Sequence, residues 1–223
     1  MTEIVFLSVK VALVAVLFAL PLAIVVARYL ATASLVPKII ISTLAHLPLV
    51  MPPVVTGYLL LLAFGRKGVI GSWLDAIGIQ LAFTWMGAAV AAAVMAFPLI
   101  LRPIRLAFET TDEAYEEMAA TLGASRWRRF RTIAMPLARP GIIAGAVLGF
   151  AKALGEFGAT ITFVSNIPGE TQTLSLAIYT LLQSPDGDSA ALWLVAISIA
   201  ISVGAVALSE TFMSYFQTKE KKT

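Results

Sequence analysis

Five apolar stretches, each long enough to cross a bilayer, restrict the fold of this chain more than any other feature. A spanning helix needs about 20 mostly apolar residues. The segments that qualify are Ile4–Val26, Ile39–Phe64, Ala82–Leu101, Gly141–Val164 and Ala190–Leu208. A further apolar stretch, Leu174–Leu182, is too short to span.

The composition supports the same fold class. Charged residues make up 13% of the 223 residues, against about 25% in soluble domains. Because backbone polar groups inside a bilayer must pair within the chain, apolar segments of this length must be helical. The sequence therefore predicts an all-α polytopic membrane helix bundle with five transmembrane helices, folded as a single transmembrane domain over residues 1–223.

A polar segment of 38 residues, Arg102–Arg139, lies between the third and fourth stretches and is called the inner loop below. It holds 7 of the 16 basic and 5 of the 13 acidic residues, so it must face water. Basic residues accumulate in cytoplasmic loops. With the N-terminus outside, twelve basic residues lie inside, namely Arg28, Lys38, the seven arginines of the inner loop, Lys219, Lys221 and Lys222, against Lys10, Arg66 and Lys67 outside. The predicted topology is therefore N-out and C-in.

The second stretch contains two prolines, Pro52 and Pro53, that a plain spanning helix avoids. Each lacks a backbone N–H and clashes with the preceding turn, so together they kink or break the helix. Carbonyl groups freed in this way are tolerated in a membrane only when they are buried in protein or line a cavity. The prolines are either a packing kink or a wall of a translocation pathway, and the sequence leaves both interpretations open.

The fourth stretch contains an opposite-charge pair, Lys152 and Glu156. Residues four apart share a helix face and can pair, and charged residues in a span usually face a bundle interior or a wet cavity. The pair is either a structural ion pair or, for Glu156, part of a gate. Gly155 and Gly158 lie on either side of Glu156 and permit close helix approach. The pathway or gate candidates are therefore Pro52, Pro53, Gly155, Glu156 and Gly158.

The rest of the composition excludes several kinds of site. The chain has no cysteine, which removes thiol catalysis and Fe–S clusters. Its single histidine, His46, argues against haem and multi-histidine metal sites and is interpreted as a packed, hydrogen-bonded residue. The isoelectric point near 9.3 reflects basic loops and topology, not nucleic-acid binding. We expect no catalytic residue, no metal site and no cofactor in this chain.

The inner loop reads E-M-A-A-T-L-G-A-S-R-W-R-R-F-R-T-I-A-M-P from Glu117 to Pro136. A short helix is predicted over Glu113–Leu122, with acidic residues in its first turns, where they suit the helix dipole, and a glycine at its end. A second helix is predicted over Ser125–Ala134, closed by Pro136. This pattern resembles the E-A-A-x3-G-x9-I-x-L-P cytoplasmic signature of ABC importer permeases. The matching residues are Glu117, Ala119, Gly123, Ile133 and Pro136, while Met118 and Met135 replace an alanine and a leucine.

Other segments extend the resemblance from about Val5 to Glu210. His46–Tyr58, Phe64–Gly71 and especially Leu154–Thr171 look like the permease subunit of molybdate and tungstate importers. Sulfate and thiosulfate permeases share a similar G-E-[FY]-G segment and are the runner-up.

This resemblance implies a type I permease fold that moves an oxyanion across the cytoplasmic (inner) membrane by alternating access. It implies two copies of the chain around one pore, a separate cytoplasmic subunit that binds and hydrolyses ATP, and an extracytoplasmic oxyanion-binding protein. The five matching residues of the inner loop would couple to the ATPase subunit, so the chain itself is not an enzyme. Membrane lipid is an expected partner and nucleic acid is not.

Two alternatives from other classes remain on the sequence alone. A membrane anchor could dock soluble partners through the basic loop, but it would not need interrupted spans. A secondary transporter would need coupling-ion carboxylates and internal repeats. No repeat is visible, and Glu156 is the one carboxylate deep enough in a span.

Overall fold

The computed structural model describes residues 1–220, which contain helices and no strand. Three helices are long and apolar enough to cross a bilayer unaided: α1 (Thr2–Thr32), α5 (Trp85–Glu109) and, over Asp188–Leu208, α12 (Asp188–Glu220). Two bent helix pairs bring the number of crossings to five if each pair counts as one. The predicted all-α bundle is confirmed, and the count of five crossings stays a prediction.

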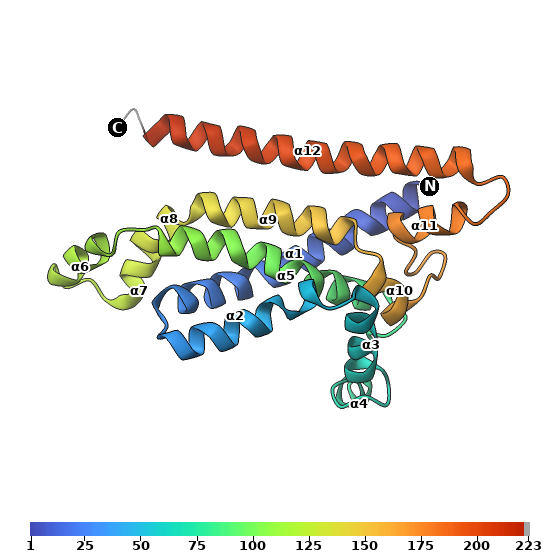
Figure 1. The fold of residues 1–223 in the computed structure, drawn as a ribbon, viewed down its shortest axis with the longest axis horizontal. Coiled ribbons are helices and arrows are strands. Elements are labelled where there is room, and N and C mark those ends of the chain that lie inside the picture. Colours follow the sequence, from blue (N-terminus) through green and yellow to red (C-terminus); the bar gives the residue numbers. More distant parts are fainter. Residues whose placement is uncertain (221–223) are drawn as a thin grey trace.

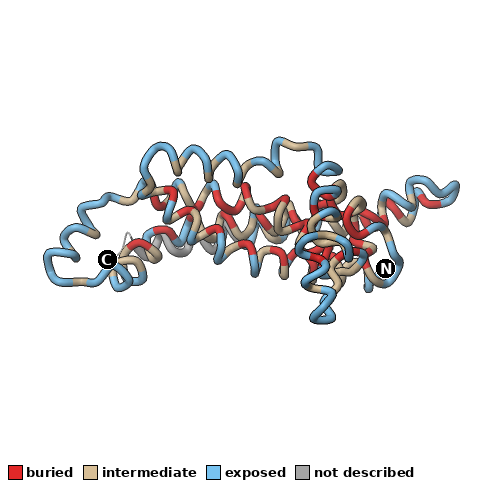
Figure 2. The backbone as a smooth tube through the Cα atoms, turned by 90° about the horizontal axis from the view of Figure 1, so that it is seen from below, coloured by how far each residue is buried: buried red, intermediate tan, exposed pale blue. Residues whose placement is uncertain are grey.

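The centre of the bundle is formed by α1, α5 and α9 (Arg139–Leu154), which run side by side in Figure 1. Figure 2 shows that buried residues concentrate along these central helices, whereas the outer helices and the turns are exposed. Small residues three or four apart put one closely packing face on a helix. The buried alanines that form such faces are Ala12, Ala15, Ala19, Ala23 and Ala27 of α1 and Ala88, Ala92 and Ala96 of α5.

Glycines every four residues bring α9 against α5. A Cβ atom added at Gly141 would lie 2.5 Å from the carbonyl oxygen of Pro103, and one added at Gly145 would lie 2.7 Å from that of Ile100. Gly149 also packs against Ile100. In a membrane, where lipid is as apolar as a side chain, such close backbone packing holds helices together. This glycine stripe was not predicted from the sequence, although its four-residue spacing is the signal for it.

The second predicted span is broken, not merely kinked. α2 (Leu35–Val50) and α3 (Pro53–Phe64) meet at 111°. α2 ends where Met51 N–H donates to Leu47 O at 2.9 Å, and Pro53 then takes the first position of α3, where its missing N–H has no helical partner to lose. Because of this break α3 lies across the long axis of the bundle (Figure 1).

The fourth predicted span, Gly141–Val164, is not one helix. α9 ends at Leu154, and α10 (Gly158–Val164) starts after a three-residue break. At its other end α9 is bent by 66° against Arg126–Leu137. Sequence periodicity alone did not show the break at Gly155–Phe157, because both sides of it are apolar.

The remaining helices complete the two ends of the bundle. α4 (Gly71–Ala76) and α11 (Leu174–Leu181) are short, and α11 is tied to α1 by Leu174 N–H, which donates to Ser8 Oγ at 2.7 Å. The inner loop lies at the opposite end of the bundle from the N-terminus (Figure 1). Of the basic residues assigned to the inner side, Lys221 and Lys222 lie outside the described residues.

Candidate functional site

The first half of the inner loop is a helix, α6 (Glu113–Thr121), with defined ends. Asp112 caps its start, since Asp112 Oδ1 accepts a hydrogen bond from Ala114 N–H at 2.9 Å. At its end Gly123 has φ +81°, and Gly123 N–H and Ala124 N–H donate to Ala120 O and Ala119 O, both at 2.9 Å. This is a Schellman arrangement, which satisfies carbonyls at the helix end and favours glycine at the left-handed position. The predicted helix and its glycine stop are confirmed to within one residue.

The second half of the loop differs from the prediction. It begins with α7 (Arg126–Arg129), continues as a π-helical turn over Phe130–Ala134 and ends as α8 (Met135–Leu137). Pro136 therefore lies inside the helical segment and does not close it. A proline in an α-helix clashes with the carbonyl four residues before it, and a π-turn directly before Pro136 widens the backbone there, as π-turns do within α-helices.

α6 presents apolar side chains to solvent. Tyr115, Met118 and Leu122 are 57%, 64% and 87% exposed, and their spacing of three and four residues puts them on one side of the helix. Within the polar inner loop such an exposed apolar stripe is the type of surface that contacts another protein. Of the predicted coupling residues, Ala119, Ile133 and Pro136 are half-buried, whereas Glu117 is exposed.

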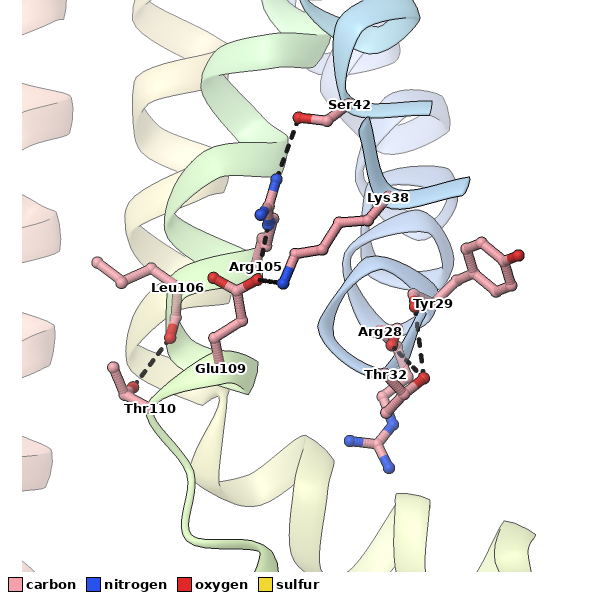
Figure 3. Close-up of polar contacts among 9 residues, drawn as sticks. All are labelled: Arg28, Tyr29, Thr32, Lys38, Ser42, Arg105, Leu106, Glu109 and Thr110. Carbon is pink, nitrogen blue, oxygen red and sulfur yellow. Dashed lines mark hydrogen bonds and ion pairs between the residues drawn. The ribbon is translucent and has the colours of Figure 1, made fainter. Parts of the chain in front are cut away.

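Ion pairs connect α6 and the end of α5 to the first two helices. Arg28 of α1 donates to Glu116 of α6 at 2.8 Å. Glu109, the last residue of α5, accepts from Lys38 of α2 at 2.7 Å and from Arg105 one turn earlier at 2.9 Å. Figure 3 shows Lys38 and Arg105 converging on Glu109, with Arg105 also reaching Ser42 of α2, at 3.1 Å. The pairs Arg28–Glu116 and Lys38–Glu109 were not predicted, because their partners are distant in the chain, by 88 residues in the first case.

The same groups surround a polar cavity of about 550 Å³ between the inner ends of α1, α2, α5 and α6. Its acidic side chains come mainly from α6, and its basic ones come from the bundle helices. Among the charge contacts around the cavity, the Arg28–Glu116 pair joins α6 to α1, so movement of α6 changes that contact directly. The charged residues that line the cavity are Arg28, Lys38, Arg105, Glu109, Glu113, Glu116 and Glu117. Among the side chains that the structure describes, no group of three or more could hold a metal ion.

The pathway candidates of the two broken spans lie together. A Cβ atom added at Gly158, the first residue of α10, would lie 2.6 Å from the Cβ of Pro53, the first residue of α3. One added at Gly57 would lie 2.5 Å from Ala159 O. α3 and α10 are thus packed backbone to backbone. Gly158 and Pro53, which are about a hundred positions apart and were each predicted as pathway candidates, therefore meet at one junction.

Glu156 lies in the break just before this junction. It is 3% exposed, and its carboxylate accepts from Lys152 Nζ at 2.6 Å and from Ala159 N–H at 3.1 Å. The predicted pairing of Lys152 and Glu156 is confirmed, but Glu156 is not on the helix of Lys152, because α9 has already ended. The carboxylate instead joins the end of α9 to the start of α10. Gly155 follows the last residue of α9, with ordinary space around it.

Two other polar residues of these segments are placed by the fold. His46 contacts Ser42 O through Nδ1 at 2.7 Å, as expected for a packed histidine. Thr56 of α3 is 3% exposed, and its hydroxyl has no hydrogen-bond partner among the described residues. The junction of α3 and α10 therefore holds a buried carboxylate and, one turn along α3, a free hydroxyl.

We expect the junction to respond sharply to one methyl group. Gly158→Ala should force α3 and α10 apart and lower the free energy of unfolding by about 1–3 kcal/mol, as in other overpacked cores. Gly155→Ala is the matched control, because the nearest atom to a Cβ there is Ala151 O at 3.6 Å. Thermal or chemical unfolding of each purified variant is the measurement. Equal loss in both variants would show that the close contact at Pro53 is not the cause.

Comparison with known proteins identifies the family. A model described as "Binding-protein-dependent transport system inner membrane component" matches residues 10–221. The chain is 56% identical over 207 residues to the molybdenum transport system permease protein ModB of Escherichia coli (strain K12), covering 92% of this chain and 90% of that protein. It is 51% identical over 214 residues to ModB of Haemophilus influenzae, covering 96% and 93%.

Two further similarities are weaker. The sulfate transport system permease protein CysT of Escherichia coli (strain K12) is 38% identical over 149 residues, which cover 67% of this chain and 54% of that protein. A solved bacterial ABC transporter involved in the import of the acidic polysaccharide alginate contains a chain of the same fold, with a TM-score of 0.72 at 18% identity, over 94% of this chain and 79% of that one. That likeness confirms the permease fold.

These similarities agree with the resemblance to molybdate importer permeases that was predicted from the inner loop and from Leu154–Thr171. The family is one of inner-membrane subunits, so the chain is a multi-pass protein of the inner membrane. The match covers nearly the whole described chain, including both broken spans and the inner loop. The chain belongs to the family of binding-protein-dependent transport system inner membrane components and, within it, to the molybdenum transport permeases.

Proposed function

We propose that this chain is the membrane-spanning subunit of an ATP-driven importer that carries molybdate, or the closely similar tungstate, inward by alternating access. The observation that carries the proposal is the identity above 50% to molybdenum permeases over nearly the whole chain. The sulfate permease matches a shorter part of the chain at lower identity, which makes sulfate the less favoured substrate. The broken spans distinguish a transporter from a membrane anchor, which has no use for them.

The substrate is tested by competition. The expected result is that cells lacking this chain lose high-affinity uptake of radioactive molybdate and regain it when the chain is restored. Excess unlabelled molybdate or tungstate should abolish that uptake, whereas the same excess of sulfate should leave most of it. Competition by sulfate as strong as that by molybdate would instead favour the sulfate permease function.

The inner loop is proposed to dock a separate ATPase subunit. The exposed stripe Tyr115, Met118 and Leu122 would enter the partner, with Glu117, Ala119, Gly123, Ile133 and Pro136 giving the loop its shape and charge. The Arg28–Glu116 ion pair would then carry movement of α6 to α1, while the pairs at Glu109 would hold the adjoining end of α5 to α2. ATP hydrolysis would take place in that partner, so this chain supplies movement and no catalytic group.

The translocation pathway is proposed to pass the junction of α3 and α10, between two copies of the chain. Pro52, Pro53, Gly155, Glu156 and Gly158 would form its wall or gate. The contact of Gly158 with Pro53 supports this assignment, because opening there requires two short helices to separate as rigid bodies. An extracytoplasmic oxyanion-binding protein would deliver the anion at the end of the bundle that carries α4 and α11.

The proposed orientation is N-out, with the inner loop in the cytoplasm. Since the chain has no cysteine, single cysteines report it cleanly. Ala120→Cys on α6 and Ser184→Cys beyond α11 both introduce exposed thiols at opposite ends of the bundle. An impermeant thiol reagent added to spheroplasts should label Ser184→Cys at once and Ala120→Cys only after lysis. The reverse pattern would invert the topology.

A further inference from the structure

A pocket of about 400 Å³ lies across the bend that joins the inner loop to α9. Its lining consists of Trp127, Phe130, Arg131, Met135, Pro136 and Arg139. Trp127 is 67% exposed and packs against Phe130, with ring centroids 5.7 Å apart. The pocket therefore combines an apolar, partly aromatic floor with two arginines.

The two arginines have no counter-charge among the side chains that the structure describes. Arg131 and Arg139 are exposed, and neither forms an ion pair with any residue that the structure describes. Four of the five acidic residues of the inner loop instead line the polar cavity, where Glu109 and Glu116 pair with Arg28, Lys38 and Arg105. A positive, apolar-floored pocket is thus left open.

The pocket lies where the apolar run of α9 gives way to the charged inner loop. Arg139 is two residues before Gly141, where the uncharged run of α9 begins. Gly141 packs against Pro103 of α5. Two residues after Pro103 comes Arg105, which pairs with Glu109 one turn later. Both central helices therefore change from apolar to charged at the same height. Tryptophan and arginine side chains are typical of this interfacial layer.

From this geometry we propose that the pocket binds the headgroup of an anionic phospholipid. The phosphate takes the space between Arg131 and Arg139, whose guanidinium groups donate charge-assisted hydrogen bonds to phosphate oxygens. The glycerol region and the start of an acyl chain lie on Trp127 and Met135. A bound lipid then braces the 66° bend between Arg126–Leu137 and α9, and so holds the docking loop at a fixed angle to the bilayer.

A docked protein is a less suitable occupant. Helix α6, which carries the exposed apolar stripe, lies at the end of the loop farthest from the bundle, whereas α8 lies next to α9 (Figure 1). A subunit that contacts the tip has to reach past α6 to fill a pocket at the bilayer surface. Lipid headgroups are already present there. The inference needs the inner loop to border a bilayer, and it holds whichever anion the protein transports.

The test is lipid binding to the purified permease with its ATPase subunit in detergent. Native mass spectrometry counts bound dioctanoyl phosphatidylglycerol, with dioctanoyl phosphatidylcholine as the zwitterionic comparison. Each arginine near an anionic headgroup contributes about fivefold in affinity. Arg131→Gln/Arg139→Gln should therefore weaken phosphatidylglycerol binding roughly thirtyfold. Arg126→Gln/Arg128→Gln is the matched control, because it removes the same charge from exposed positions of α7 that do not line the pocket.

Trp127→Ala serves as a second variant that leaves both charges in place, and it should weaken binding severalfold. Equal weakening in the two arginine pairs would overturn the proposal, since it would mean diffuse attraction with no defined site. Equal binding of the two lipids by the unmodified protein would also overturn it. Loss of the ATPase subunit from Arg131→Gln/Arg139→Gln in lipid-free detergent, with retention by the control pair, would assign the pocket to that subunit instead.

Discussion

Lys152→Met is expected to lower the free energy of unfolding by about 3 kcal/mol, near the lower end of the range for breaking a buried ion pair. The substitution leaves the carboxylate of Glu156 almost fully buried, with the Ala159 N–H as its remaining partner. The lysine side chain is 28% exposed, which keeps the cost from reaching the top of the range. Chemical or thermal unfolding of the purified variant and of the unmodified protein measures this difference in the free energy of unfolding.

The reciprocal substitution should cost less. Glu156→Gln leaves Lys152 with access to water and keeps an oxygen that can accept from Ala159 N–H. The double variant should recover most of the stability lost in Lys152→Met. If Glu156 belongs to the gate, molybdate uptake will stay low in the double variant although stability returns. Uptake at the unmodified level in that variant would remove Glu156 from the pathway and leave it a structural role.

Gly123→Val is expected to uncouple the permease from its ATPase subunit without preventing membrane insertion. Gly123 has φ +81° and ends α6, and a β-branched residue in this left-handed conformation costs about 1–2 kcal/mol. Relief of that strain unwinds the last turn of α6 and displaces Leu122 from the exposed stripe. Copurification of the ATPase subunit and transport-dependent ATP hydrolysis should both fall by about tenfold, the equivalent of about 1.4 kcal/mol.

Gly78→Val is the control for strain alone. Gly78 has φ +79° in the turn after α4, and no atom lies within 4 Å of a Cβ added at either glycine. The two variants therefore carry the same backbone penalty at opposite ends of the molecule. Full ATPase coupling in Gly123→Val, or the same loss of coupling in Gly78→Val, would show that the shape of the α6 end is not what the partner recognises.

Local features of the sequence predicted local features of the structure well. The apolar stretches gave the helical fold class, and an acidic first turn followed by Gly123 gave α6 nearly to the residue. Pro52 and Pro53 marked the place of the first break. These features depend on backbone chemistry that acts within a few residues, such as a missing N–H, a left-handed turn or a helix dipole, so no knowledge of the tertiary fold was needed.

Features that depend on tertiary contacts were not predicted. Gly141–Val164 is mostly apolar, so periodicity indicated one helix, whereas the structure ends α9 at Leu154 and starts α10 at Gly158, which packs on Pro53 of α3. The Arg28–Glu116 pair joins residues that nothing in the sequence associates. The contact between Gly158 and Pro53 was likewise invisible, although both residues had been selected. Pro53 was selected because proline breaks a helix, and Gly158 because glycine permits close helix approach. Their contact arises only from the close packing of α3 against α10.

The central claim is tested most directly by transport in a purified system. The permease is reconstituted into proteoliposomes with its ATPase subunit inside the vesicles with ATP and its oxyanion-binding protein outside, in the geometry that the proposed orientation requires for import. The account predicts accumulation of radioactive molybdate that depends on both ATP and the binding protein, with little accumulation of radioactive sulfate, and loss of that accumulation in Gly123→Val. Molybdate entry that persists without ATP, or no entry although ATP is hydrolysed by the complete complex, would contradict it.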